Sequence, residues 1–103
     1  MRRAEVFLHN QKAGLLEEIE AGTRYRFCYE SGYLGPPISL TMPVQEEPYE
    51  YDVFPSFFEG LLPEGFNLEA LLRKIKIDRN DLFSQLTAVG EDMVGAVTVR
   101  EVE

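Results

Sequence analysis

The sequence contains no tryptophan, one cysteine and one histidine, and these shortages exclude several kinds of site. A structural zinc ion needs about four ligands, mostly Cys and His, so no Cys/His cluster can hold one here. Cys28 has no second cysteine with which to form a disulfide, which fits a reducing cytoplasm. Its position in an aromatic run predicts that it is a small buried hydrophobe.

Long hydrophobic runs are also absent. No stretch approaches the roughly 18 apolar residues that are needed to cross a bilayer. The N-terminal sequence MRRAEVFLHN has no apolar core of a signal peptide. We therefore expect a cytoplasmic protein that makes no membrane contact.

The residue inventory offers no combination that points to catalysis. His9 falls in an expected turn, where a solvent-facing side chain is the simplest interpretation. Gly32 and Gly35 stand in neither of the glycine patterns that cradle phosphates. Glu46 and Glu47 are neighbours in an expected loop, with nothing to raise the pKa of one and leave that of the other low. We expect no enzyme activity, no metal and no cofactor.

Positive charge is scarce, because 10 Lys and Arg residues stand against 18 Asp and Glu residues, for a formal net charge of −8. Such a field repels phosphate backbones, so we expect no direct nucleic-acid binding. The surplus is open to two interpretations: a solvated surface, or steering toward a basic protein partner. The acidic groups are Glu17, Glu18 and Glu20; Glu46, Glu47, Glu50 and Asp52; Glu91 and Asp92; and Glu101 and Glu103.

The 103 residues are enough for one hydrophobic core, and no linker or repeat divides them, so we expect a single domain. Alternation of apolar and polar residues predicts the strands of an antiparallel meander, and a β-branched stretch near the end predicts a strand added to it. These strands are expected at 3–9, 15–20, 24–29 and 94–102. A hairpin loop is expected at 9–14.

Prolines and glycines interrupt the middle of the chain. Residues 31–37 are expected to be irregular, 38–42 to form a short strand or extended piece, and 45–52 to form a surface loop. Pro55 suits the first turn of a short helix over 56–62. The class is therefore α+β, with the sheet packed against two or three short helices.

Two further helices follow from periodicity. The spacing of Leu68, Leu71, Leu72 and Ile75 predicts an amphipathic helix. Asp78 is a good N-cap for the next helix, which Gly90 closes.

The segment FPSFFEGLLPEGF, residues 54–66, is too apolar for a loop and too broken for one long helix. Its apolar side chains suit either the core or a partner surface. Phe66 follows PEG at an expected bend between two helices, where an aromatic side chain either seals the core or projects into a partner.

These pieces stand in the order found in the N-terminal subdomain of HipA-type Ser/Thr protein kinases, the toxins of bacterial toxin–antitoxin modules. The chain resembles that subdomain over residues 4–100. The matching stretches are VFLHNQKAGLLEE, RYRFCYE, ISLTMPV, FFEGLLPEG, LEALLRKIKI, DRNDLFSQLTAVGED and VGAVTV. FFEGLLPEG and GED-x-x-GAV are fairly specific when they occur together.

The ATP-binding and catalytic-aspartate motifs of a HipA kinase do not occur in this sequence. The chain is therefore most similar to the HipS-like proteins of tripartite HipBST modules, in which the subdomain accompanies a shortened kinase, HipT, and a DNA-binding protein, HipB. The resemblance implies an antitoxin that docks on a HipT-like kinase where full-length HipA keeps its own subdomain. It also implies a ternary complex with a HipB-like helix-turn-helix protein and a link to bacterial persistence.

We expect the kinase interface on the segment that carries the strongest match, with Phe66 reaching the kinase lobe. The candidate residues are Phe57, Phe58, Leu61, Leu62, Pro63, Glu64, Gly65 and Phe66. The candidates for steering are Glu46, Glu47, Glu50 and Asp52. Three alternatives stay open: a non-inhibitory subunit of a HipB-containing repressor complex, a fragment of a full-length kinase, and a small enzyme.

Overall fold

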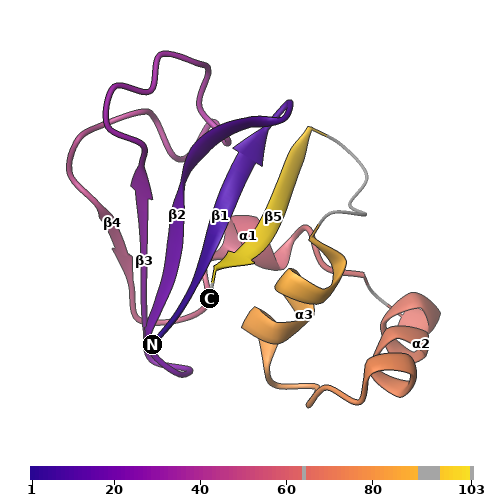
Figure 1. The fold of residues 1–103 in the computed structure, drawn as a ribbon. Coiled ribbons are helices and arrows are strands. Elements are labelled where there is room, and N and C mark those ends of the chain that lie inside the picture. Colours follow the sequence, from indigo (N-terminus) through magenta and orange to yellow (C-terminus); the bar gives the residue numbers. More distant parts are fainter. Residues whose placement is uncertain (64, 91–95, 103) are drawn as a thin grey trace.

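The computed structural model describes residues 1–63, 65–90 and 96–102, and of residues 65 and 66 it describes the backbone only. A five-stranded antiparallel sheet in the order β4-β3-β2-β1-β5 is accompanied by short helices (Figure 1). The strands are β1 (Arg2–Leu8), β2 (Gln11–Glu20), β3 (Arg24–Tyr29), β4 (Tyr49–Tyr51) and β5 (Val97–Val102). The helices are α1 (Ser56–Glu59), α2 (Gly65–Ile75) and α3 (Leu82–Val89). The expected α+β class, with a meander and an added strand, is confirmed.

The first hairpin is tighter than expected. The expected loop over 9–14 is wrong, because a turn at His9 and Asn10 joins β1 to β2, which already starts at Gln11. Both turn residues have positive φ, at 50° and 68°. This is the backbone that matches the right-handed twist of paired strands. β2 includes the turn-like stretch KAG, where an irregularity interrupts the alternation: Val6 pairs with Gly14 and Phe7 with Lys12, so Ala13 is an extra residue in β2, and Ala13 and Gly14 are both buried.

The middle of the chain differs in two places. The expected surface loop over 45–52 contains β4, which pairs with β3 through Tyr25 and Tyr51. The short strand or extended piece expected at 38–42 is instead a tight turn, in which the Met42 N–H donates to the Ser39 carbonyl at 3.0 Å and an isolated bridge joins the two residues. Flanking prolines and glycines explain the second difference, because a regular ladder needs continuous backbone donors.

The core lies between one face of the sheet and the helices. Val6, Leu16 and Phe27 point inward from consecutive strands and have no exposed surface. Phe58 and Phe83 meet them from α1 and α3 and are equally buried. In Figure 1, α1 lies behind the sheet and α3 lies beside β5. Burial of these large side chains contributes about 1.5–3 kcal/mol each.

The N-cap of α3 is Asp81, so the expected cap at Asp78 is wrong. Asp81 Oδ1 accepts the Ser84 N–H at 3.1 Å, whereas the carboxylate of Asp78 accepts the Asn80 N–H, in the turn before the helix. Arg2 favours Asp81 over Asp78 as the cap, because its guanidinium pairs with Glu18 at 2.7 Å and with Asp81 at 2.9 Å. This cluster ties β1, β2 and the start of α3 together.

Gly90 follows α3 as expected, and its backbone carbonyl accepts the Val99 N–H. The last strand is observed from Val97, while residues 94 and 95 of the expected strand lie outside the described residues. β5 pairs with β1, which confirms that the last strand is added to the meander.

Candidate partner-binding surface

The apolar segment that precedes α2 is divided between the core and the surface. Phe58 is fully buried, with its ring centroid 5.9 Å from that of Phe27. Leu62 is also buried in the core. These two residues therefore serve packing in the free domain, although the sequence placed them in the candidate interface.

Three other residues of the segment retain accessible surface. Phe57 and Leu61 are half-buried and pack on the outside of the core, and Pro63 is half-buried at the end of the segment. The Phe57 ring meets the Phe58 ring edge-on, at 5.2 Å between centroids. The rotation of a short helix explains the division, because adjacent residues on α1 point in different directions.

The rest of the candidate segment leads into α2. Glu64 lies outside the described residues. The backbone of Gly65 and Phe66 forms the start of α2, and the side chains of these two residues are not part of the described structure. As a partner interface, the segment stays a prediction.

Two exposed leucines, which sequence reasoning missed, lie on the segment that connects β3 to β4. Leu34 and Leu40 are 95% and 96% exposed. The signal that could have found them was an apolar residue in each of two Pro- and Gly-flanked stretches that cannot enter the sheet.

Tyr29, at the end of β3, and Tyr33, four residues later, hold the segment between β3 and β4 in place. The Tyr29 hydroxyl donates to the carbonyl oxygen of Met42 and accepts the N–H of Ile38 at 3.1 Å. Tyr33 stacks on Tyr29 with 5.7 Å between ring centroids, and its hydroxyl donates to the carbonyl oxygen of Pro36 at 2.6 Å. The exposed leucines are therefore carried on a braced segment.

The four carboxylates considered for steering differ in whether a basic side chain lies close to them. Glu46, Glu47 and Asp52 are exposed around β4. Glu50 lies within β4 and its carboxylate is 3.8 Å from the guanidinium of Arg26 on β3. One of the four carboxylates is thus partly neutralised by a neighbouring strand.

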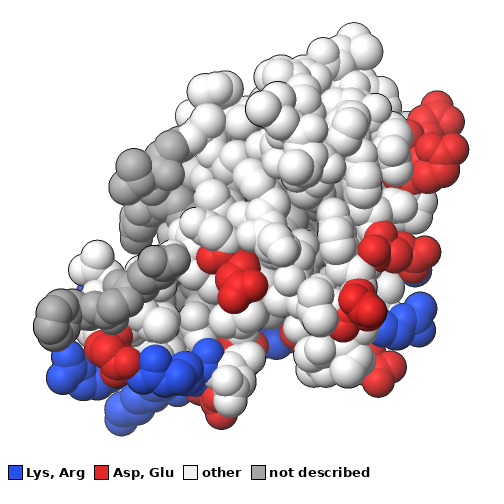
Figure 2. All heavy atoms as spheres, turned by 180° about the vertical axis from the view of Figure 1, so that it is seen from behind, with Lys and Arg blue, Asp and Glu red and all other residues white. Residues whose placement is uncertain are grey.

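Charge is unevenly distributed over the molecule. Figure 2 shows Lys and Arg side chains gathered at the lower left, toward the side on which α2 lies, and most of the visible Asp and Glu side chains toward the right. Its upper part shows little charge apart from a group of Asp and Glu side chains at the right edge. A partner with the opposite separation of charge would be oriented by this pattern.

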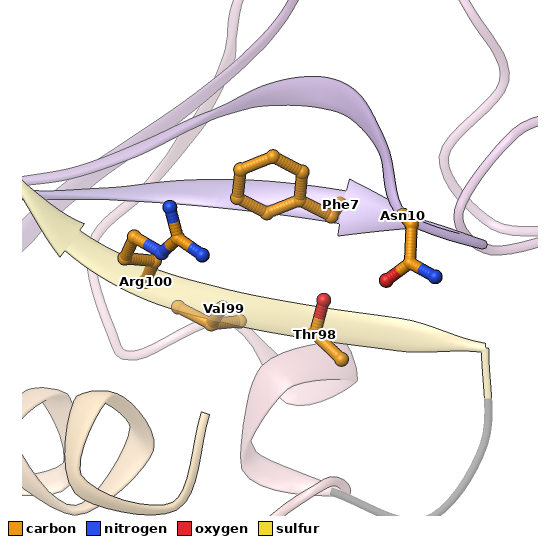
Figure 3. A pocket seen from close by; sticks show the side chains of 5 residues that line it. All are labelled: Phe7, Asn10, Thr98, Val99 and Arg100. Atoms are coloured by element: carbon orange, nitrogen blue, oxygen red, sulfur yellow. The ribbon is translucent and has the colours of Figure 1, made fainter. Parts of the chain in front are cut away.

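A shallow hollow of about 350 Å³ lies between β1 and β5, on the face of the sheet away from the helices. Phe7, Asn10, Thr98 and Arg100 line it with their side chains (Figure 3). The Arg100 guanidinium lies 5.6 Å from the centre of the Phe7 ring. The hollow brings together no acid–base pair, and within residues 1–63, 65–90 and 96–102 no cluster of His, Cys, Asp and Glu could hold a metal ion.

The lone cysteine also lies on that outer face. Cys28 is half-buried rather than in the core, since Phe27 and Tyr29 on either side of it point inward. Burial and the charge of Glu17 raise the pKa of the Cys28 thiol. The thiolate is therefore disfavoured, which argues against a nucleophile.

None of the helices in the described part of the chain is long and apolar enough to cross a membrane. His9 is exposed in the β1–β2 turn, in agreement with the position expected from the sequence.

Comparison with known proteins gives consistent results. The model of the HipA N-terminal domain family matches residues 4–100. A protein of Haemophilus influenzae that carries only the description "uncharacterized" is 36% identical over 101 residues, which are 98% of this chain and 93% of that protein. A solved structure described as the N-terminal domain of HipA toxin has a TM-score of 0.79 and 33% identity, and the match covers 100% of this chain and 94% of that one.

Proposed function

The chain belongs to the HipA N-terminal domain family, and from this membership we propose that it is an antitoxin that binds and neutralises a HipT-like Ser/Thr kinase. The observation that carries the proposal is the extent of the match, since the N-terminal domain of a HipA toxin is covered almost from end to end. A domain of this kind acts on a kinase by binding it and needs no catalytic group of its own. We accordingly propose no enzyme activity and no cofactor.

The surface of the segment before α2 supports a binding role. Phe57, Leu61 and Pro63 keep part of their apolar surface accessible beside a well-packed core. Interfaces are enriched in aromatic residues and depleted of charge at their centres. Docking on the kinase at the place of the HipA N-terminal domain would cover this surface.

The proposed mechanism is obstruction or distortion of the kinase active site. Gly65 and Phe66 are the first two residues of α2, and Pro63, at the end of the preceding segment, is half-buried. A large aromatic side chain at the start of a helix is suited to fill a pocket on a partner, where one residue can carry much of the binding free energy. We propose that Phe66 reaches the kinase lobe.

The test is a pull-down and a growth-rescue assay with the adjacent HipA-type kinase. We expect the wild-type chain to bind the kinase and restore growth. Phe66→Ala should keep the melting temperature within a few degrees while rescue weakens, because truncation of a central aromatic commonly costs binding more than 2 kcal/mol, roughly 30-fold in affinity.

The control is Phe7→Ala, which removes an aromatic ring from the opposite face of the sheet, where Arg100 covers it. This variant should rescue growth like the wild type at equal protein level. Full rescue by Phe66→Ala would remove Phe66 from the mechanism, and failure of the wild-type chain to bind the kinase would refute the antitoxin proposal itself.

The alternative is a non-inhibitory subunit of a DNA-bound repressor complex with a HipB-like helix-turn-helix protein. The net charge of −8 disfavours contact of this chain with DNA, so in this alternative we propose that the HipB-like partner binds the DNA. Co-expression separates the two functions: an antitoxin rescues growth with the kinase alone, whereas a subunit of this kind needs the DNA-binding protein as well.

A further inference from the structure

Helix α2 carries an apolar face that the rest of the domain covers only in part. Leu68, Leu71, Leu72 and Ile75 lie at the spacing of one helix face, yet each is only half-buried. None of residues 67–75 is buried, and none of these four side chains joins the hydrophobic cluster of the core. In Figure 1, α2 stands apart from the sheet, beyond α3.

A helix as short as α2 is expected to be only marginally stable in isolation. α2 has 11 residues, and helices below about 12–15 residues are weakly populated in water unless their apolar face is packed. α1 and α3 meet that condition, because they supply Phe58, Phe83 and Leu86 to the core. The sequence of α2 therefore fits a helix that is covered by something outside this domain.

The C-terminal end of α2 is the most basic part of the chain. Arg73 and Lys74 stand in its last turn, and Lys76 and Arg79 follow it. These are four of the 10 basic residues of the protein, within seven consecutive positions. Arg79 pairs with Glu69 of the same helix. The other three form no ion pair with a carboxylate among the described residues, and Figure 2 shows positive charge gathered on this side.

We propose that the apolar face of α2 docks into an apolar groove on the kinase that is edged by carboxylates, with Arg73, Lys74 and Lys76 meeting those carboxylates. The inference rests on the proposed antitoxin function and identifies the surface through which that function is exerted. Opposite charges across an interface fix the orientation of the partners and raise the association rate. An amphipathic helix held in a groove by one apolar stripe is a recurring mode of protein recognition.

The groove belongs to a different protein and not to a second copy of this chain. The exposed carboxylates around β4 lie at the edge of the molecule away from α2, as Figures 1 and 2 together show. Contact of α2 with that edge on another copy would be head-to-tail and would not close into a dimer. α2 also has only 11 residues, whereas a standard interface uses about 20–30 residues on each partner, so a contact between α2 helices of two copies would be too small by itself. Leu61 and Pro63, just before α2, extend the surface in the direction of the candidate segment.

The test measures the affinity of purified chain variants for the purified HipA-type kinase by titration calorimetry. Leu71→Gln with Leu72→Gln replaces apolar side chains by a residue of similar helix propensity. We expect a loss of affinity of about tenfold or more. The melting temperature should stay within a few degrees of the wild type, because these side chains are not packed in the core.

The matched control is Leu34→Gln with Leu40→Gln, the same chemical change on the segment between β3 and β4, far from α2 in Figure 1. It should change the affinity less than about twofold, as expected for a substitution outside the interface. A second pair tests the charges. Arg73→Gln with Lys74→Gln should slow association several-fold and weaken its salt dependence, whereas Arg3→Gln with Arg24→Gln, also exposed, should not.

The outcomes separate this inference from the proposed function. Wild-type binding with unchanged affinity of the α2 variants would overturn the docking of α2 and leave the antitoxin function standing. Absence of wild-type binding would refute both. A concentration-dependent dimer abolished by the leucine substitutions would assign α2 to a second copy, and binding of α2 to anionic phospholipid vesicles without any effect on kinase affinity would assign it to a membrane surface; either result would overturn the inference.

Discussion

Asp81 shows how a single residue was chosen from two candidates by its surroundings. Asp78 and Asp81 stand three residues apart, and each has the carboxylate that an N-cap requires. Of the two, Asp81 is the one whose carboxylate accepts hydrogen bonds from Arg2 on β1 and from the Ser84 hydroxyl on α3. Sequence alone predicted a capped helix here but placed the cap one turn too early.

The same cluster predicts how stability responds to pH. Burial by itself raises the pKa of Asp81, but the hydrogen bonds from Arg2 and Ser84 outweigh it, so the pKa is lowered. A lowered pKa in the folded state means that the carboxylate stabilises the fold above its unfolded value of about 3.9 and that this stabilisation is lost as the pH falls below it. Asn caps a helix about as well as Asp, so Asp81→Asn should remove mainly the ion pair with Arg2 and reduce the free energy of unfolding by about 0.5–1 kcal/mol at pH 7.

The measurement is urea unfolding of both proteins at pH 7, 4.5 and 3. The difference between them should shrink at the lowest pH. Asp78→Asn is the matched control, since Asp78 caps only a turn, and it should cost less than about 0.5 kcal/mol. An equal difference at all three pH values would contradict the role of the Asp81 charge.

The elements were easiest to predict where one periodicity runs without interruption. Tyr25, Phe27 and Tyr29 alternate through β3, and all three are buried. Prediction failed where the pattern was too short to be read, as at Tyr49–Tyr51, which forms β4 only because β3 offers an edge to pair with. A three-residue strand has no period of its own, so its existence depends on a partner strand.

The β1–β2 turn gives a prediction at the scale of the elements. His9 and Asn10 both adopt positive φ, which strains a residue such as histidine. Asn-Gly is the preferred sequence for a two-residue turn of this kind. The double change His9→Asn with Asn10→Gly should therefore raise the free energy of unfolding by about 0.5–1 kcal/mol.

Thermal and urea unfolding of that variant would measure the gain. The control is Gly22→Ala, at a glycine that also has positive φ, at 80°, but with open space around it. It should be destabilised, because alanine tolerates that backbone poorly. A loss of stability in the turn variant would show that the hairpin does not carry the strain assigned to it.

For the whole molecule, the separation of charge has a kinetic consequence. The carboxylates of Glu46 and Glu47 are exposed at the edge opposite α2 and have no ion-pair partner among the described residues. We propose that they steer the chain toward basic residues of the kinase. Glu46→Gln with Glu47→Gln should slow association a few-fold at low salt and leave dissociation unchanged.

Surface plasmon resonance at about 20 and 200 mM salt would separate the two rates, because the Debye length shortens over that range. The matched control is Glu20→Gln with Glu101→Gln, which removes the same charge from exposed sites elsewhere. An equal slowing in both variants would mean that net charge alone matters, and that local steering does not occur.

The sequence by itself determined the class, the order of the main strands and helices, the membership of the HipA N-terminal domain family and the absence of a Cys/His metal site, because these depend on local periodicity, composition and motif order. Only the tertiary structure decided which apolar residues are covered. Phe57 and Phe58 are adjacent residues of the same type, yet Phe58 lies in the core and Phe57 keeps accessible surface. In the same way, Leu62 is buried whereas Leu71 keeps accessible surface. The physical reason is that burial depends on what other elements bring to a position, and at α2 the domain brings little.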